Sequence, residues 1–334
     1  MRSILRTRHL VLATVTTVAL ALAATRPELF GDRVHNALDG LAEAEPLWLW
    51  AAAAGFAFMH VLSGLAWRSA LGACGTPTQR SDAVARYGVG SGLNAVAPAH
   101  LGSAARIALF ARTVDGEGGA WRVGGAAACV GVVRSVWLAA LVGFAALTGA
   151  VPVWPLALLG GVLVVAAGAA VFSRKVRLER RCAHILDAFQ GLVRAPRSLA
   201  VVAALTALGM AAKLAAATAV AAALSVEHPL LAALVVVPAV ELAAVMPVTP
   251  GNAGVASAAV AFVLGAHGVA ADTALAAGIA FGAVETLSAL ALGACGALCL
   301  AAPAMRPVVR VAAASTAVVA VTGAYSATVL LPLP

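Results

Sequence analysis

Two proline–glycine breaks interrupt sequence that is otherwise hydrophobic enough for a membrane interior. The first runs from Asn94 to Arg106 and contains Pro98, His100 and Gly102. The second contains Pro247, Thr249, Pro250, Gly251, Asn252 and Gly254. Because a helix in hydrocarbon must satisfy its own backbone, such breaks persist only where they are buried in protein or line a polar cavity. One break in each half of a chain is the usual sequence indication of a translocation site between repeats.

Composition identifies the broad class of the protein. Of the 334 residues, 62% are hydrophobic and 11% are charged, and the mean hydropathy is +0.98. These values are typical of an integral membrane protein rather than of a soluble domain. The net charge of +8 does not indicate nucleic-acid binding, because the charges lie at the ends of apolar runs, where they set orientation and contact anionic headgroups.

Hydropathy predicts a single all-α domain over 1–334 with about seven transmembrane helices. The expected spans are 10–25, 47–67, 123–149, 154–173, 198–224, 273–300 and 311–332. The first run could instead be a cleaved signal sequence, although a retained span suits a polytopic protein better. The segment 174–197 is basic and amphipathic, and it either lies on the inner leaflet or serves only to stop transfer.

Two further apolar regions, 84–112 and 230–266, are divided by the breaks into pieces too short to cross a bilayer alone. We expect each to form a re-entrant helical hairpin that enters and leaves on one side. With a cytoplasmic N-terminus in the plasma membrane, this map places most of the 22 Lys and Arg residues inside, in agreement with the positive-inside rule, and it places the C-terminus outside. The hairpins then open toward opposite sides, which is the arrangement expected of an inverted repeat. If 230–266 instead crosses once as a kinked span, Arg306, Arg310 and the C-terminus change sides.

Four ionisable side chains lie within the apolar segments, namely Arg134, Lys213, Glu241 and Glu285. Each is costly in hydrocarbon unless paired or hydrated, so each is a functional candidate. They could simply pair with one another. Alternatively, Arg134 and Lys213 attract a phosphate while a glutamate balances the empty site or carries a proton. Arg106 could receive a lipid headgroup, or it could be an interfacial arginine that reaches toward water.

The polar residues of the breaks have weaker assignments. His100 could donate to a phosphate or titrate near neutral pH, or it could be an ordinary hydrated loop histidine. Asn94, Thr249 and Asn252 could cap backbone groups freed by the breaks. The sequence contains no Walker loop, dinucleotide fingerprint, nucleophile elbow or metal-ligand cluster. We therefore expect no cofactor, no metal and no enzymatic activity.

Both breaks resemble motifs of the lysylphosphatidylglycerol synthase transmembrane-region family. The run Pro98-Ala-His-Leu-Gly102-Ser-Ala-Ala-Arg106 is similar to that family's P-G-R-L-G-D-x-x-R. The run that begins at Pro247 is similar to P-x-x-x-G-G-x-G-V-x-E. Arg134 stands where the family has E-R-x-x-D. The resemblance covers roughly residues 45–300, and most acidic residues of the family motifs are replaced, for example by Ser103 and Ser257.

The resemblance implies a membrane domain that moves an anionic or aminoacylated phospholipid between leaflets. We expect no lysyl-lipid synthesis, because the 334 residues leave no room for a soluble synthase domain. The leading hypothesis is a flippase or scramblase for an anionic or polyprenyl-phosphate-linked lipid, with membrane lipids as its partners. The alternatives are a non-transporting accessory of a membrane glycosyltransferase or synthase, and an ion-coupled carrier of a small anion. The sequence does not indicate an oligomeric state.

Overall fold

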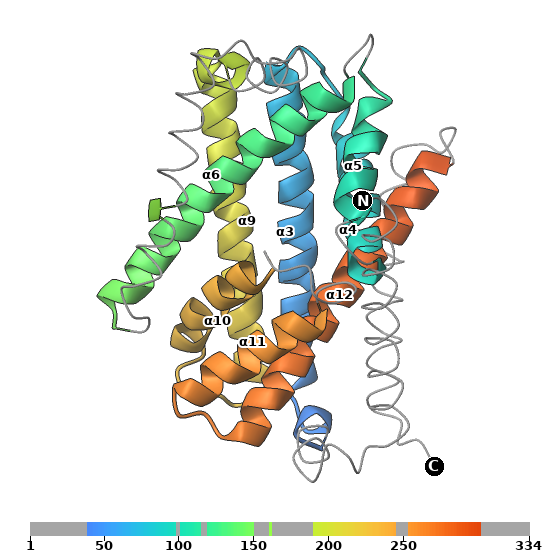
Figure 1. Cartoon of the computed structure of the whole chain (residues 1–334). Coiled ribbons are helices and arrows are strands. Elements are labelled where there is room, and N and C mark those ends of the chain that lie inside the picture. Colours follow the sequence, from blue (N-terminus) through green and yellow to red (C-terminus); the bar gives the residue numbers. More distant parts are fainter. Residues whose placement is uncertain are drawn as a thin grey trace, which may run out of the picture.

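The computed structural model of the chain describes residues 39–97, 101–114, 119–149, 160–161, 190–244 and 253–301. All regular secondary structure in these ranges is helical (Figure 1). The main elements are α3 (Pro46–Ala73), α4 (Arg80–Val96), α5 (Leu101–Ala111), α6 (Gly119–Leu147), α9 (Pro196–Ala223), α10 (Pro229–Ala243), α11 (Ala253–Ala266) and α12 (Ala271–Ala301).

Four of these helices, α3, α6, α9 and α12, are long and apolar enough to cross a membrane. They correspond to the spans predicted at 47–67, 123–149, 198–224 and 273–300. The regions 84–112 and 230–266 each form a pair of shorter helices, α4–α5 and α10–α11. The spans predicted at 10–25, 154–173 and 311–332 lie outside the described residues, as does most of the basic segment 174–197.

Proline residues mark several helix boundaries for local steric reasons. Pro46, Pro196 and Pro229 occupy the first turns of α3, α9 and α10, where the missing N–H costs no hydrogen bond. At the first break, Ala97 is extended, with φ −94° and ψ 142°. The residue before a proline is disfavoured in helical conformation, so α4 ends at Val96, and Ala97 is already outside the helix.

The order of helices occurs twice along the described chain. A long helix, a pair of shorter helices and a second long helix appear first as α3, α4–α5 and α6, and then as α9, α10–α11 and α12. In this order α3 corresponds to α9, α4 to α10, α5 to α11 and α6 to α12. Whenever two helices are in substantial contact, their two counterparts are also in contact. For example, α4 contacts α12 and α10 contacts α6, while α5 contacts α6 and α11 contacts α12, although the contacts made by α12 are much the more extensive in both cases.

The two halves run in opposite directions. The N–H of Glu45, before α3, donates to the carbonyl of Ala223 at the end of α9, so α3 and α9 are antiparallel. In Figure 1, α4 and α5 lie toward the top of the bundle and α10 and α11 toward the bottom. The two helix pairs are therefore opposed.

Small residues allow the closest helix contacts. A Cβ atom added to Gly88 on α4 would lie 2.7 Å from the carbonyl oxygen of Leu292 on α12, and one added to Gly92 would lie 3.0 Å from the Cα of Gly293. Glycine at such positions lets two backbones approach, as is common between helices in membranes.

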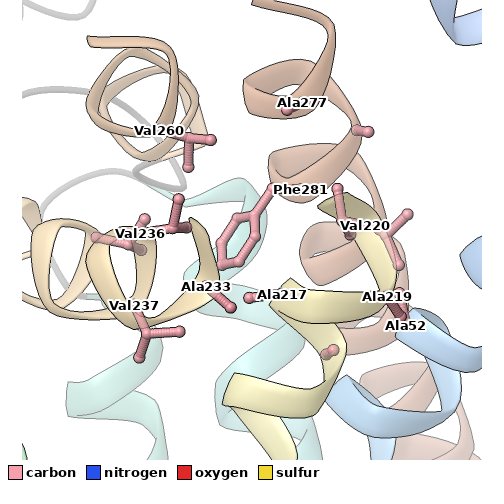
Figure 2. Packing of buried hydrophobic residues seen from close by; sticks show 14 of the residues in the cluster. Ala52, Ala217, Ala219, Val220, Ala233, Val236, Val237, Val260, Ala277 and Phe281 are labelled. Carbon is pink, nitrogen blue, oxygen red and sulfur yellow. The ribbon is translucent and has the colours of Figure 1, made fainter. Parts of the chain in front are cut away.

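Two buried apolar clusters lie on either side of a polar layer. One contains Phe56 and Phe281, whose rings meet edge to face at 5.1 Å, and its packing around Phe281 is shown in Figure 2. The other contains Trp67, Tyr87 and Phe110. Along α6, Val130 belongs to the second cluster and Leu138 to the first. Arg134 lies between these two residues, and the polar layer around it contains the candidate site.

Candidate functional site

The four ionisable residues of the apolar segments meet in one network. Arg134 Nη2 on α6 lies 2.6 and 2.8 Å from the two carboxylate oxygens of Glu241 on α10. Lys213 Nζ on α9 donates to Glu241 Oε1 at 2.9 Å and to Glu285 Oε1, on α12, at 2.9 Å. We call these four residues the charge quartet. It joins four helices from both halves of the chain.

The quartet is largely buried and electrically balanced. The Lys213 and Glu241 side chains are 5% and 10% exposed, whereas that of Arg134 is 42% exposed. Two cations and two carboxylates sum to zero, which is how buried charges are normally tolerated. Breaking one buried pair leaves an uncompensated charge and is strongly destabilising.

Arg106 lies beside the quartet but has a different environment. Its Nη2 donates to Ser91 Oγ at 3.1 Å, and its guanidinium lies 3.9 Å from the Tyr87 ring centroid and 5.5 Å from the Trp67 ring centroid. Its buried Nε has no hydrogen-bond acceptor among the described residues. The described side chains give Arg106 aromatic contacts and no carboxylate partner.

Two cavities adjoin these charges. The larger, of about 290 Å³, is lined by all four quartet residues and by Arg106. The smaller, of about 190 Å³, shares Arg106, Arg134 and Lys213 with the first, but no described carboxylate lines it. Ser63 and Thr206 supply hydroxyls to the smaller cavity. We call these the mixed chamber and the cationic chamber.

The mixed chamber contains three cations and two carboxylates among its described lining residues. The net charge of these five side chains is therefore +1. A site with a surplus cation and a cation-lined neighbour binds anions in preference to cations. Guanidinium and ammonium groups together, backed by aromatic rings, are suited to the oxygens of a phosphate group.

The structure places only some of the remaining residues of the two breaks near the chambers. Asn94 and Ser103 line the mixed chamber. Gly102 serves packing, because a Cβ there would overlap the Asn94 nitrogen and the Gly90 carbonyl oxygen. Gly254 is exposed near the start of α11. The positions of the breaks that lie outside the described residues are Pro98, His100, Pro247, Thr249, Pro250, Gly251 and Asn252.

Sequence reasoning missed His60, Tyr87 and Trp67. His60 on α3 lines the mixed chamber, Trp67 lines the cationic chamber, and Tyr87 lines both. A histidine inside the apolar span 47–67 is a signal that could have identified His60, because ionisable residues in membrane spans are rare. The two aromatic residues carry no comparable signal, since most buried aromatic residues only pack.

The described residues contain no group of three His, Cys, Asp or Glu side chains placed to hold a metal ion.

Comparison with known proteins identifies the chain at the level of family. A family model described as the lysylphosphatidylglycerol synthase TM region matches residues 10–293. The match begins earlier than the expected 45 and ends close to the expected 300. No curated protein matches the chain.

Proposed function

Because the chain belongs to the lysylphosphatidylglycerol synthase transmembrane-region family, we propose that it passes a lipid headgroup between the leaflets of the plasma membrane. The lipid is anionic or linked to polyprenyl phosphate, and it is not chemically altered. The observation that carries this proposal is one surplus positive charge, that of Arg106 beside the balanced quartet, at two adjoining cavities within an apolar bundle.

The energetic obstacle to lipid exchange is the charged headgroup rather than the acyl chains. The chains can remain in hydrocarbon throughout, whereas a bare charge in the bilayer centre costs several kcal/mol or more. A path of fixed cations lowers that cost by replacing lost hydration. Arg106, Arg134 and Lys213 line both chambers and are the residues proposed to form this path.

The quartet offers a way to receive and release the anion. In the empty site, Glu241 and Glu285 hold the cations, so the cations are balanced without substrate. An entering phosphate competes with these carboxylates for Arg134 and Lys213. When the anion leaves, the carboxylates return to the cations. A carboxylate displaced in this way could take up a proton, which would couple exchange to a proton gradient.

We further propose that α4–α5 and α10–α11 are re-entrant hairpins of an inverted repeat. The opposed placement of the two pairs (Figure 1) and the exchangeable set of helix contacts support this topology. In transporters built from inverted repeats, binding sites lie near the membrane midplane between the repeats, and the quartet likewise draws on helices of both halves.

The test is leaflet exchange in liposomes that contain the purified chain. Labelled anionic phospholipid, labelled polyprenyl phosphate and a zwitterionic lipid are compared, with and without a proton gradient. We expect faster exchange of an anionic lipid than in empty liposomes. Arg134→Ala and Glu241→Gln should each slow it about tenfold, equivalent to about 1.4 kcal/mol in the barrier.

Arg112→Gln provides the matched control, because Arg112 is an exposed arginine just beyond α5. Exchange that equals that of empty liposomes for both anionic lipids would contradict the proposal. In that case, co-purification of a membrane glycosyltransferase or synthase would favour the accessory role, and uptake of a water-soluble anion would favour the carrier.

A further inference from the structure

His60 is a buried polar side chain with unused hydrogen-bonding capacity. It lies on α3, is 9% exposed and lines the mixed chamber. Neither Nδ1 nor Nε2 has a hydrogen-bond partner among the described residues. Buried polar atoms without partners are rare and cost free energy, so an imidazole that lines a cavity in this state is placed to form a hydrogen bond with a group that enters the cavity.

Uncharged polar groups accompany His60 in this chamber. The side chains of Ser91, Asn94 and Thr286 also line it. Together with His60 they provide hydroxyl, amide and imidazole groups, each able to donate or accept a hydrogen bond. The two chambers share Arg106, Arg134 and Lys213, but among the described residues only the mixed chamber has carboxylates and His60 in its lining.

We infer that the mixed chamber binds a hydroxyl-bearing, uncharged polyol group through His60, while the adjoining cations hold the phosphate to which that group is attached. This inference rests on the proposed function and specifies the headgroup that the site selects. The same chemistry occurs in a lipid headgroup and in a free phosphorylated polyol, so the test includes both.

Hydroxyl groups match this chamber better than the other common headgroup substituents do. In its neutral form, imidazole has one donor and one acceptor nitrogen, and a hydroxyl can both donate and accept. An ammonium group can only donate hydrogen bonds, and the five charged side chains that line the chamber, Glu241 and Glu285 included, sum to +1, which disfavours a further positive charge. A methyl ester would leave His60 unpaired, and a second anion would exceed the single surplus positive charge.

The experiment measures binding to the full-length chain in detergent, by the shift of its melting temperature with ligand concentration. The lipid probes are short-chain phosphatidylmethanol, phosphatidylglycerol and phosphatidylinositol, which carry the same single charge and differ in headgroup hydroxyls. Glycerophosphoinositol serves as the soluble probe. The variants are His60→Leu, His60→Asn and Arg106→Gln. His267→Leu is the matched control, because His267 is exposed after α11.

Wild type should bind phosphatidylinositol about threefold to tenfold more tightly than phosphatidylmethanol, as expected for one or two added hydrogen bonds. His60→Leu should abolish this preference while still binding phosphatidylmethanol, which also shows that the variant is folded. His60→Asn should retain part of the preference, and His267→Leu all of it. Stabilisation by glycerophosphoinositol would extend the site to soluble phosphorylated polyols, and its absence would restrict the site to lipids.

Equal binding of the three lipids by wild type, or a preference that survives in His60→Leu, would overturn this inference. In either case, loss of all lipid binding in Arg106→Gln would leave the proposed function standing. If Arg106→Gln instead binds phosphatidylmethanol as tightly as wild type does, Arg106 does not bind the anionic headgroup, and the proposed function is wrong. The two failures are therefore distinguishable.

Discussion

At the scale of single residues, Lys213 connects both carboxylates of the quartet. Its ammonium group contacts Glu241 and Glu285 at 2.9 Å each. If Lys213 is replaced by methionine, Glu241 keeps Arg134 as a partner, but Glu285 loses the cation to which it is bonded. We therefore expect Lys213→Met to lower the free energy of unfolding by about 3 kcal/mol, measured by denaturant titration in detergent.

A charge-balanced second substitution tests whether that loss is electrostatic. Lys213→Met combined with Glu285→Gln leaves the Arg134–Glu241 pair intact and removes the unpaired carboxylate. The double variant should recover about 1 kcal/mol or more relative to Lys213→Met. A double variant as unstable as the sum of the two single variants would show that the residues act independently, contrary to the network.

The residue types in the apolar spans identify part of this site from sequence alone. Arg134, Lys213, Glu241 and Glu285 stand out because charges in such spans are rare. Their pairing is not readable from sequence, since Arg134 and Glu241 are 107 positions apart and meet only through the packing of α6 on α10. The sequence also does not show that the His60 ring nitrogens lack hydrogen-bond partners, because this depends on which residues of α4 and α12 pack around the ring.

At the scale of elements, Gly102 determines how closely α4 and α5 approach. A Cβ at this position would overlap backbone atoms of Asn94 and Gly90, and backbone cannot move aside as a flexible side chain can. Gly102→Ala should therefore separate the pair, displace Arg106, and lower both thermal stability and lipid exchange. We expect exchange to fall about tenfold, the effect of about 1.4 kcal/mol.

Gly124→Ala on α6 is the matched control for this substitution. No atom lies within 4 Å of the position its Cβ would occupy, and alanine favours a helix over glycine by about 1 kcal/mol. Its melting temperature should equal or exceed that of wild type. If Gly102→Ala behaves in the same way, the close packing of α4 on α5 is not as described.

Both broken regions are recognisable from sequence, because each gathers proline, glycine and polar residues at one point of an apolar run. A single proline is not enough, since Pro238 lies inside α10. The bounds of α4 and α5 follow closely from Pro98, since the preceding Ala97 must leave the helix. Sequence does not indicate which helices the pairs contact. The glycines of α4 that fit against α12 are indistinguishable in sequence from the other glycines of the chain.

At the scale of the whole molecule, equivalent positions of the two halves recur at nearly constant spacing. Pro46 and Pro196 begin α3 and α9 and are 150 residues apart, whereas Pro98 and Pro250 are 152 apart. Each break reads Pro-x-x-x-Gly, ending at Gly102 and Gly254. The charge bias of the sequence predicts opposed hairpins, but the nearly constant spacing of equivalent positions becomes apparent only once the helix boundaries are known.

An inverted repeat places equivalent positions on opposite sides of the membrane. Glu45 and Ala195 are the residues that precede α3 and α9, so they are such a pair. In a cysteine-free background, Ala195→Cys should react with a cytoplasmic reagent, whereas Glu45→Cys and Ala270→Cys should react from outside. Protection of Ala270→Cys from the external reagent would contradict the two-hairpin topology.

Passage of an anionic headgroup through the bundle should depend most on Arg106, the surplus cation of the two chambers. The most direct measurement is the initial rate of anionic phospholipid exchange in liposomes for wild type, Arg106→Gln and Arg112→Gln, each reconstituted at equal density. We expect Arg106→Gln to lose about tenfold or more of the protein-dependent rate, whereas Arg112→Gln should keep the wild-type rate. Equal loss in both variants, or no loss in Arg106→Gln, would contradict this dependence on Arg106.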